Sequence, residues 1–209
     1  SRPLIEDLDE LPMPGYHFVE GHVDEYHFKM MAGSKRYVII EGSRGCSHGC
    51  TFCSQCAFWG RRWRSKSAKR IADEMQYCHE RFGAEFIWLT DDNFAFGPRS
   101  EQLTDELIGR GLGDEILWFV QARVDDVANN ERMLPKLRRS GNAWQLLGVE
   151  TGDPRGLKKF GKDIDPDQSK RAVSLLTDND IFAQATFIIG HRGDSREPIA
   201  GLRRIADES

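Results

Sequence analysis

The chain has 209 residues, of which 39% are hydrophobic and 30% charged, and its formal net charge is −4. This length and apolar content predict one large globular domain rather than two small ones. The sequence has neither an apolar run long enough to span a membrane nor the basic and hydrophobic blocks of a signal peptide, so we expect a cytoplasmic protein. The mild negative charge gives no general attraction to nucleic acid or anionic lipid, which favours a small or uncharged partner and makes nucleic-acid binding unlikely.

The first 36 residues are predicted to form a leader or linker, which is acidic and proline-containing up to about Gly15. Five short and almost continuously apolar runs follow, a pattern typical of strands buried on both faces. They cover residues 37–41, 86–90, 117–122, 144–149 and 182–190. The intervals between them leave room for a crossover helix each time, so the runs predict parallel β/α units.

Helical patterns fill these intervals. Behind a Ser67 cap, apolar residues recur at helical spacing and include Cys78, which we therefore expect in the core. A later helix is expected to end at Gly141, because glycine can adopt the left-handed conformation that stops a helix. Another is expected to begin at Asp165, with Pro166 at the first helical position and Gln168 as the capping-box partner.

About five β/α units predict an α/β fold, either a partial parallel barrel or, as the fallback, a doubly wound sheet. The chain ends at Ser209, inside what resembles a fifth helix, so we expect an incomplete barrel over residues 37–209 that is truncated at its carboxyl end. Ligands of such folds sit at the carboxyl ends of the strands. The residues predicted there are the candidates for function.

The cysteines give the sharpest signal. Cys46, Cys50, Cys53 and Cys56 fall within eleven residues, directly after the first predicted strand. Such crowding is typical of a metal site or a catalytic site rather than of a disulfide framework. In the spacing CxxxCxxC, three thiolates can each bind one iron of a four-iron four-sulfur cluster and leave the fourth iron open.

This motif resembles the hallmark of the radical S-adenosylmethionine (radical SAM) superfamily, which has an aromatic residue before the last cysteine, here Phe52. The resemblance covers nearly the whole chain. It implies that Cys46, Cys50 and Cys53 hold the cluster and act in catalysis. It also implies that S-adenosylmethionine chelates the open iron and is cleaved to a deoxyadenosyl radical, with electrons from a donor such as flavodoxin or ferredoxin.

Two alternatives remain open at this point. Cys56 could complete a four-thiolate zinc site, although zinc ligands usually come as two separated pairs. The run of basic and aromatic residues at 58–66 could bind RNA, but we prefer a solvated connection because the chain as a whole is acidic. A zinc-stabilised interaction or RNA-binding module is therefore the rival to an enzyme.

The resemblance also implies cofactor-binding residues at the strand ends. Asp91, Asp92 or Asn93 stands where the family has acceptors for the methionine amine. Gln121 and Arg123 lie at the end of the next predicted strand. The Arg123 guanidinium could pair with the methionine carboxylate or equally with the nearby Asp125. The segment with Glu150 resembles one that reaches the cofactor's ribose and methionine. The segment with Ile188 resembles one that packs on the adenine, and His191 after it could face the substrate or be structural.

Two further resemblances concern the branch of the family. Residues 7–14 resemble the linker that joins an amino-terminal cobalamin-binding domain to the radical domain in cobalamin-dependent members. Residues 53–59 resemble the branch that contains the anaerobic magnesium-protoporphyrin IX monomethyl ester cyclase. The implied reaction is hydrogen abstraction from a small-molecule substrate, as in a tetrapyrrole-type oxidative cyclisation, with a cobalamin-dependent C-methyltransferase as the enzymatic alternative.

Overall fold

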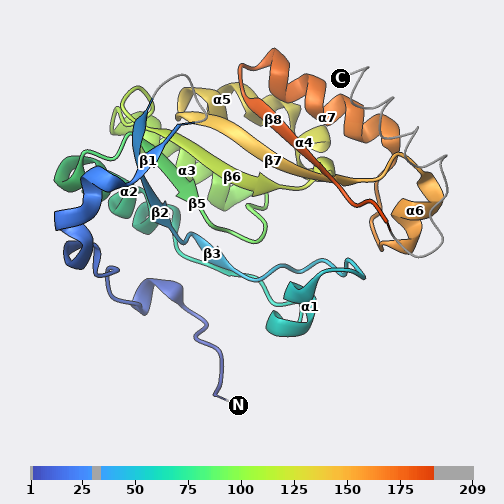
Figure 1. Ribbon diagram of the computed structural model, residues 1–209, viewed down its shortest axis with the longest axis horizontal. Coiled ribbons are helices and arrows are strands. Elements are labelled where there is room, and N and C mark those ends of the chain that lie inside the picture. The colour runs from blue at the N-terminus through green and yellow to red at the C-terminus, as the bar shows by residue number, and fades with distance from the viewer. Residues whose placement is uncertain (1, 30–33, 191–209) are drawn as a thin grey trace.

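A computed structural model of the chain describes residues 2–29 and 34–190. Its main feature is a six-stranded sheet curled into a half-barrel, with strands in the order β1-β2-β5-β6-β7-β8 (Figure 1). The strands are β1 (His27–Phe28), β2 (Lys35–Ile40), β5 (Phe86–Leu89), β6 (Leu117–Ala122), β7 (Asn142–Glu150) and β8 (Phe182–Phe187). Five of them run parallel, and β1 adds an antiparallel edge beside β2.

Helices cover the convex face of this sheet, while a two-stranded ribbon, β3 (Ser43–Arg44) with β4 (Arg64–Ser65), extends beyond β2 (Figure 1). The α-helices are α1 (Ser54–Trp59), α2 (Ala68–Phe82), α3 (Pro98–Gly109), α4 (Val124–Asn129), α5 (Leu134–Arg139), α6 (Pro154–Lys159) and α7 (Pro166–Asp178). The 3-10 helices are η1 (Leu8–Glu10), η2 (Tyr16–Glu25) and η3 (Glu131–Met133).

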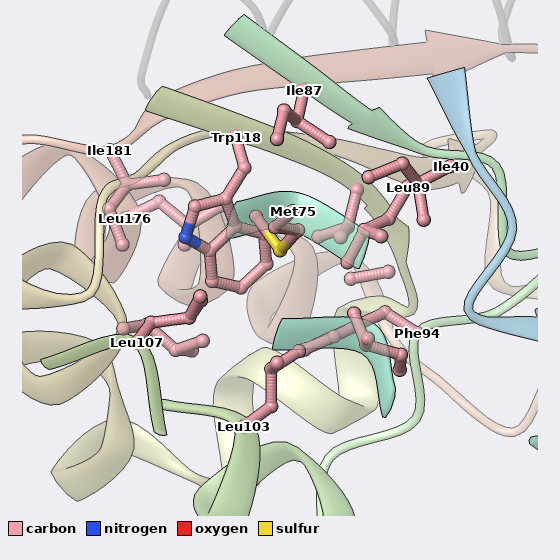
Figure 2. Packing of buried hydrophobic residues seen from close by; sticks show 14 of the residues in the cluster. Ile40, Met75, Ile87, Leu89, Phe94, Leu103, Leu107, Trp118, Leu176 and Ile181 are labelled. Carbon is pink, nitrogen blue, oxygen red and sulfur yellow. The ribbon is translucent and has the colours of Figure 1, made fainter. Parts of the chain in front are cut away.

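The main core lies between the sheet and the helices (Figure 2). Trp118 of β6 is fully buried at its centre beside Met75 of α2 and Leu107 of α3. Its indole N–H donates to the Ser140 carbonyl at 2.8 Å, so the one polar atom of this large side chain is satisfied. Truncating a fully buried side chain such as Met75 to alanine is expected to cost about 2–5 kcal/mol of stability.

A second, aromatic cluster fills the concave face at the amino-terminal ends of the strands. It contains Phe86, Phe119 and Trp144, and Phe28 of β1 stacks on Phe86 with 4.6 Å between ring centroids. Aromatic side chains bury large areas and pack well in such tilted and stacked pairs. This cluster occupies the amino-terminal part of the concave face and leaves the carboxyl ends of the strands for a site.

The five predicted parallel strands and the partial barrel are confirmed. The predicted helix starts are also confirmed, because Ser67 accepts from the Arg70 N–H and the Asp165–Gln168 capping box forms in both directions. The prediction that every strand is buried on both faces is wrong for β2 and β8, whose residues are mostly half-buried or exposed because these strands lie toward the edges of the sheet. Cys78 is buried as predicted.

The expectation of a solvated connection at residues 58–66 is wrong for two of its cations. Arg64 is 7% exposed and lies over the Trp59 ring, with its guanidinium carbon 5.1 Å from the centroid. Lys66 is 2% exposed and pairs with the fully buried Glu74 at 2.8 Å. Buried charges need such partners, so these cations belong to the interior and not to a basic surface.

The amino-terminal segment lies along α2 and β4 rather than apart from them. Leu8 is fully buried, the Ser67 N–H donates to Asp9 at 2.9 Å, and Arg70 donates to the Leu11 carbonyl at 3.0 Å. The segment is therefore packed on the domain, beside the ribbon of β3 and β4. Among the described residues, no helix combines the length and apolar character needed to cross a membrane.

Candidate functional site

The cysteine loop starts at the end of β3 and runs across the carboxyl end of the sheet into α1 (Figure 1). Its first residue, Gly45, has φ +84°, a conformation that favours glycine. A Cβ there would lie 2.0 Å from the Arg62 carbonyl oxygen. No side chain fits at this position, so the close approach of the loop to the chain entering β4 requires glycine.

The tip of the same loop is held by residues that follow β7. The Thr51 N–H donates to the Phe160 carbonyl at 2.9 Å, and the Thr51 hydroxyl donates to the Lys159 carbonyl at 2.9 Å. The Phe52 ring meets the Phe160 ring edge-on at 5.3 Å. The loop is thus fixed at both ends, by the ribbon on one side and by the end of α6 on the other.

A pocket of about 270 Å³ lies beneath the loop and collects most of the predicted site residues. Its lining comprises Cys46, Cys50, Phe52, Cys53, Gln55, Asp92, Asn93, Gln121, Ala122, Arg123, Leu146, Gly148, Glu150, Lys162 and Thr186. Asp91 and Ile188 are not part of this lining, and His191 lies outside the described residues.

The thiols of the loop divide into three that line the pocket and one that does not. Burial raises the pKa of the Cys46 thiol. The Cys56 thiol lies outside the pocket and donates to the His48 carbonyl at 3.1 Å. Three pocket thiols are the number that a four-iron cluster with one open iron requires.

Within the described part of the chain, no three His, Cys, Asp or Glu side chains are grouped closely enough to hold a single metal ion. A tetrahedral zinc site would bring its ligands within about 2.3 Å of one ion. A cube of four irons and four sulfides spaces its thiolates further apart, because each thiolate binds a different iron. Cys46, Cys50 and Cys53 of one loop can offer one thiolate each to three different irons.

Two cations line the pocket. Arg123 donates to Asp125 through Nε at 2.8 Å and Nη2 at 3.1 Å, and its Nη1 lies 3.8 Å from Cys50 Sγ. Lys162 is 7% exposed and donates to Glu150 at 2.6 Å and to the Gly148 carbonyl at 2.7 Å. The sequence left open whether Arg123 contacts the nearby aspartate; Arg123 does make this contact, with Asp125, and it also faces the Cys50 thiol.

The three polar residues after β5 have different surroundings. Asp91 is fully buried and accepts from two backbone N–H groups and from Arg99, so its oxygens are already engaged. Asp92 accepts from the Gly45 N–H at 3.0 Å. Asn93 is 4% exposed, and its Oδ1 is a buried acceptor without a protein partner. A buried unpaired acceptor at the edge of a pocket is suited to receive a donor from a ligand.

The remaining candidates lie at the ends of β6, β7 and β8. Gln121 donates to the Asp91 carbonyl at 3.4 Å. Glu150 is 7% exposed and has φ +65°, which is strained for a side chain of this size. Its carbonyl accepts from the Ile188 N–H at 2.8 Å, which places the Ile188 backbone beside Glu150.

Lys162 was missed by the sequence analysis. It follows a short helix that no apolar periodicity announces, although Asp153 caps that helix and Pro154 begins it. These two residues are a standard helix-start signal and could have predicted α6. They could not have predicted that Lys162 turns back to the end of β7.

Residues 40–206 match the profile of the Radical SAM superfamily. The chain belongs to this superfamily. Membership implies a four-iron four-sulfur cluster and S-adenosylmethionine as cofactors and makes this radical SAM chain an enzyme, which overturns the zinc-stabilised module. The donor set fits the cluster, because three free cysteines of one loop line one pocket.

Curated relatives of this radical SAM chain include both cyclases and methyltransferases. It is 32% identical to the anaerobic magnesium-protoporphyrin IX monomethyl ester cyclase of Rubrivivax gelatinosus over 99% of this chain and 36% of that protein. It is 31% identical to an uncharacterized methyltransferase of Pyrococcus horikoshii over 98% of this chain and 43% of that protein. The chain thus spans less than half of the length of either relative.

Solved structures share the fold of the radical SAM chain. The methyltransferase TsrM of Kitasatospora setae, with cobalamin and a four-iron cluster bound, superposes with a TM-score of 0.74 at 18% identity over 83% of this chain and 33% of that chain. The cobalamin-dependent radical enzyme OxsB, with aqua-cobalamin and S-adenosylmethionine bound, gives a TM-score of 0.69 at 21% identity over 80% of this chain and 26% of that chain.

Proposed function

We propose that the chain is the catalytic core of an enzyme that reductively cleaves S-adenosylmethionine and abstracts hydrogen from a carbon of a small-molecule substrate. The observation that carries the proposal is the single pocket into which Cys46, Cys50 and Cys53 face together with acceptors and cations. When bound, the cluster supplies the electron and an open iron for the methionine amine and carboxylate.

The residues of the chain then bind and orient S-adenosylmethionine. Asn93 Oδ1 accepts from the methionine ammonium, because it is the buried acceptor left without a protein partner. Lys162 has a donor position left beyond its bonds to Glu150 and Gly148, and it attracts the methionine carboxylate. Gln121 and Glu150, which both line the pocket, offer amide and carboxylate groups for the ribose hydroxyls.

Other parts of the pocket exclude water from the radical. Leu146 and Phe52 provide apolar lining, and Ile188, whose backbone is bonded to Glu150, would lie on the side on which an adenine packs. Leu146 also packs against the aromatic cluster that contains Trp144, so apolar side chains continue from the pocket into that cluster. Apolar surroundings of this kind protect a carbon radical from quenching by solvent.

For the reaction, we favour hydrogen abstraction in an oxidative cyclisation of the tetrapyrrole type, as the name of the Rubrivivax relative suggests. The second candidate is a cobalamin-dependent C-methyltransferase, favoured by the fold shared with TsrM and OxsB. In either case, residues 1–36 would connect the core to a preceding cobalamin-binding domain. Flavodoxin or ferredoxin would supply electrons in the cytoplasm, where thiols remain reduced.

Anaerobic reconstitution with iron and sulfide tests the proposal. We expect about four iron and four sulfide per chain, and release of deoxyadenosine when S-adenosylmethionine and a strong reductant are added. One tightly held zinc in a colourless protein would contradict it. Transfer of a methyl group to the substrate, with cobalamin required, would identify the methyltransferase instead of the cyclase.

A further inference from the structure

We propose that Asp91 and Asp92 are positioning residues that tie the backbone entering the cysteine loop to the end of β5, with Asp92 controlling how firmly the loop retains iron. This inference rests on the proposed function for its link to the cluster. The hydrogen bonds that Asp91 and Asp92 accept from this backbone do not depend on a bound cluster. Asp91 and Asp92 leave the binding of the methionine amine to their neighbour Asn93.

Asp91 holds the first part of this backbone. Its Oδ1 accepts from the Gly42 N–H and the Ser43 N–H, both at 2.8 Å. A Cβ on Gly42 would lie 2.8 Å from the same oxygen, so the carboxylate approaches the main chain as closely as glycine permits. Arg99 donates to Oδ2 at 3.3 Å and compensates the buried charge.

Asp92 holds the next part. Its Oδ2 accepts from the Gly45 N–H at 3.0 Å, one residue before Cys46. Burial raises the pKa of Asp92, whereas the hydrogen bonds from the Gly45 backbone and the Trp59 side chain lower it. Trp59 also packs against Gly45, since its Cβ lies 3.1 Å from where a Gly45 Cβ would be.

The two carboxylates thus engage three N–H groups within four residues, from Gly42 to Gly45. Hydrogen bonds from backbone N–H groups to carboxylates are stronger than neutral ones. On its other side, this segment pairs with β4, and the Gly42 carbonyl accepts from the Lys66 N–H at 2.9 Å. A shift of Gly45 passes directly to Cys46, so loss of the Asp92 bond should loosen the first of the three iron ligands.

A different role must be separated from this one. Asp92 also lines the pocket and could instead bind the methionine amine. In that case its removal would weaken binding of S-adenosylmethionine and leave the retention of iron unchanged. If Asp92 instead positions the loop, its removal should speed the loss of iron, because the loop loosens whether or not S-adenosylmethionine is present.

The variants Asp92→Ala and Asp92→Asn distinguish the two roles. Asparagine keeps an oxygen that can accept from the Gly45 N–H, whereas alanine has none. Asp178→Ala, at the exposed end of α7, is the matched control for loss of one acid. The first measurement is the rate at which an anaerobic chelator removes iron from the reconstituted chain, together with the affinity for S-adenosylmethionine.

We expect Asp92→Ala to lose iron about tenfold faster than the unmodified chain, with Asp92→Asn and Asp178→Ala close to the unmodified chain. Equal rates in all four proteins would overturn the proposal. So would weaker binding of S-adenosylmethionine by Asp92→Ala at an unchanged rate of iron loss. Equal thermal denaturation midpoints of the iron-free proteins would show that the variants still fold.

A second measurement needs no iron. Amide hydrogen exchange of residues 41–47 in the iron-free chain should be faster in Asp92→Ala than in Asp92→Asn, because the Gly45 N–H loses its acceptor. Unchanged exchange would overturn the positioning role even if the chain proved to bind no iron. Absence of iron from the unmodified chain, with the exchange result as expected, would overturn only the proposed function.

Discussion

Arg123 Nη1 lies 3.8 Å from the Sγ of Cys50 while the rest of its guanidinium is held by Asp125. The side chain of Arg123 is 11% exposed, so little water screens its charge. Hydrogen bonds and positive charge near the sulfurs of an iron–sulfur cluster favour the reduced state. Asp125 therefore keeps a cation aimed at one of the three proposed ligands.

The variant Arg123→Met should make the cluster harder to reduce, because it removes both a donor and a positive charge. We expect about a tenfold fall in the ratio of reduced to oxidised cluster at a fixed potential, equivalent to about 59 mV for a one-electron couple. An anaerobic redox titration followed by electron paramagnetic resonance measures this shift. Arg171→Met, on an exposed pair with Glu131, is the control that should leave the potential unchanged.

Single cysteine substitutions should separate Cys56 from the other three loop cysteines. Cys46→Ala, Cys50→Ala and Cys53→Ala should each abolish stable incorporation of the four-iron cluster, because each removes the ligand of one iron. Cys56→Ser should keep about four iron per chain, since the Cys56 thiol lies outside the pocket and donates to a backbone carbonyl. Loss of iron in Cys56→Ser would instead make Cys56 a ligand.

The buried pair of Lys162 and Glu150 should be strongly coupled. Lys162→Met leaves the Glu150 carboxylate buried without its cation and should destabilise the chain by about 3–5 kcal/mol. The double variant Lys162→Met with Glu150→Gln should regain part of that loss. Urea denaturation of the four proteins of this cycle measures the coupling, and additive losses would contradict it.

Two glycines with similar positive φ angles should respond differently to alanine. Gly60→Ala meets open space at φ +63° and should cost only the backbone strain of about 1–2 kcal/mol. Gly45→Ala adds a clash with the Arg62 carbonyl and should cost more than about 3 kcal/mol or displace the loop. Iron content and thermal denaturation compare the two, and equal behaviour would refute the close approach at Gly45.

The stability of the iron-free chain should decrease between pH 3.8 and about 6, because of Asp126. Burial, followed by the neighbouring Asp125, raises the pKa of Asp126 from 3.8 to about 6. A raised carboxyl pKa means that the folded chain binds more protons than the unfolded chain in this window, so stability falls as pH rises. Asp126→Asn should remove the part of that slope that comes from Asp126 and add about 1–2 kcal/mol at pH 7, after allowance for partial exposure. Denaturation as a function of pH measures both effects.

The sequence predicted the parallel strands and the longer helices because their patterns are local. The Ser67 cap and the Asp165–Gln168 capping box need only a few neighbouring residues. The two-residue strands β1, β3 and β4 were missed, since so short a segment has no periodicity. Their positions depend on partners distant in the chain.

The candidate site was predictable in its residue types but not in the roles of individual residues. Asp91, Asp92 and Asn93 are adjacent and chemically similar, and only the fold shows which backbone groups they meet. Lys162 reaches β7 through a tertiary contact across 12 residues, which no local pattern encodes. These distinctions depend on tertiary packing rather than on propensity.

The attachment of Thr51 and Phe52 to the end of α6 has a mechanical consequence. The cysteine loop starts at the end of β3, which follows β2 near one edge of the sheet, and its tip is bonded to the segment that follows β7, near the other edge. The loop therefore bridges the carboxyl ends of the strands. Any widening or narrowing of the half-barrel changes the distance between its two attachment points, at Gly45 and at Thr51. Because Cys46 and Cys50 lie between these two points, bending of the sheet would alter the spacing of their thiolates.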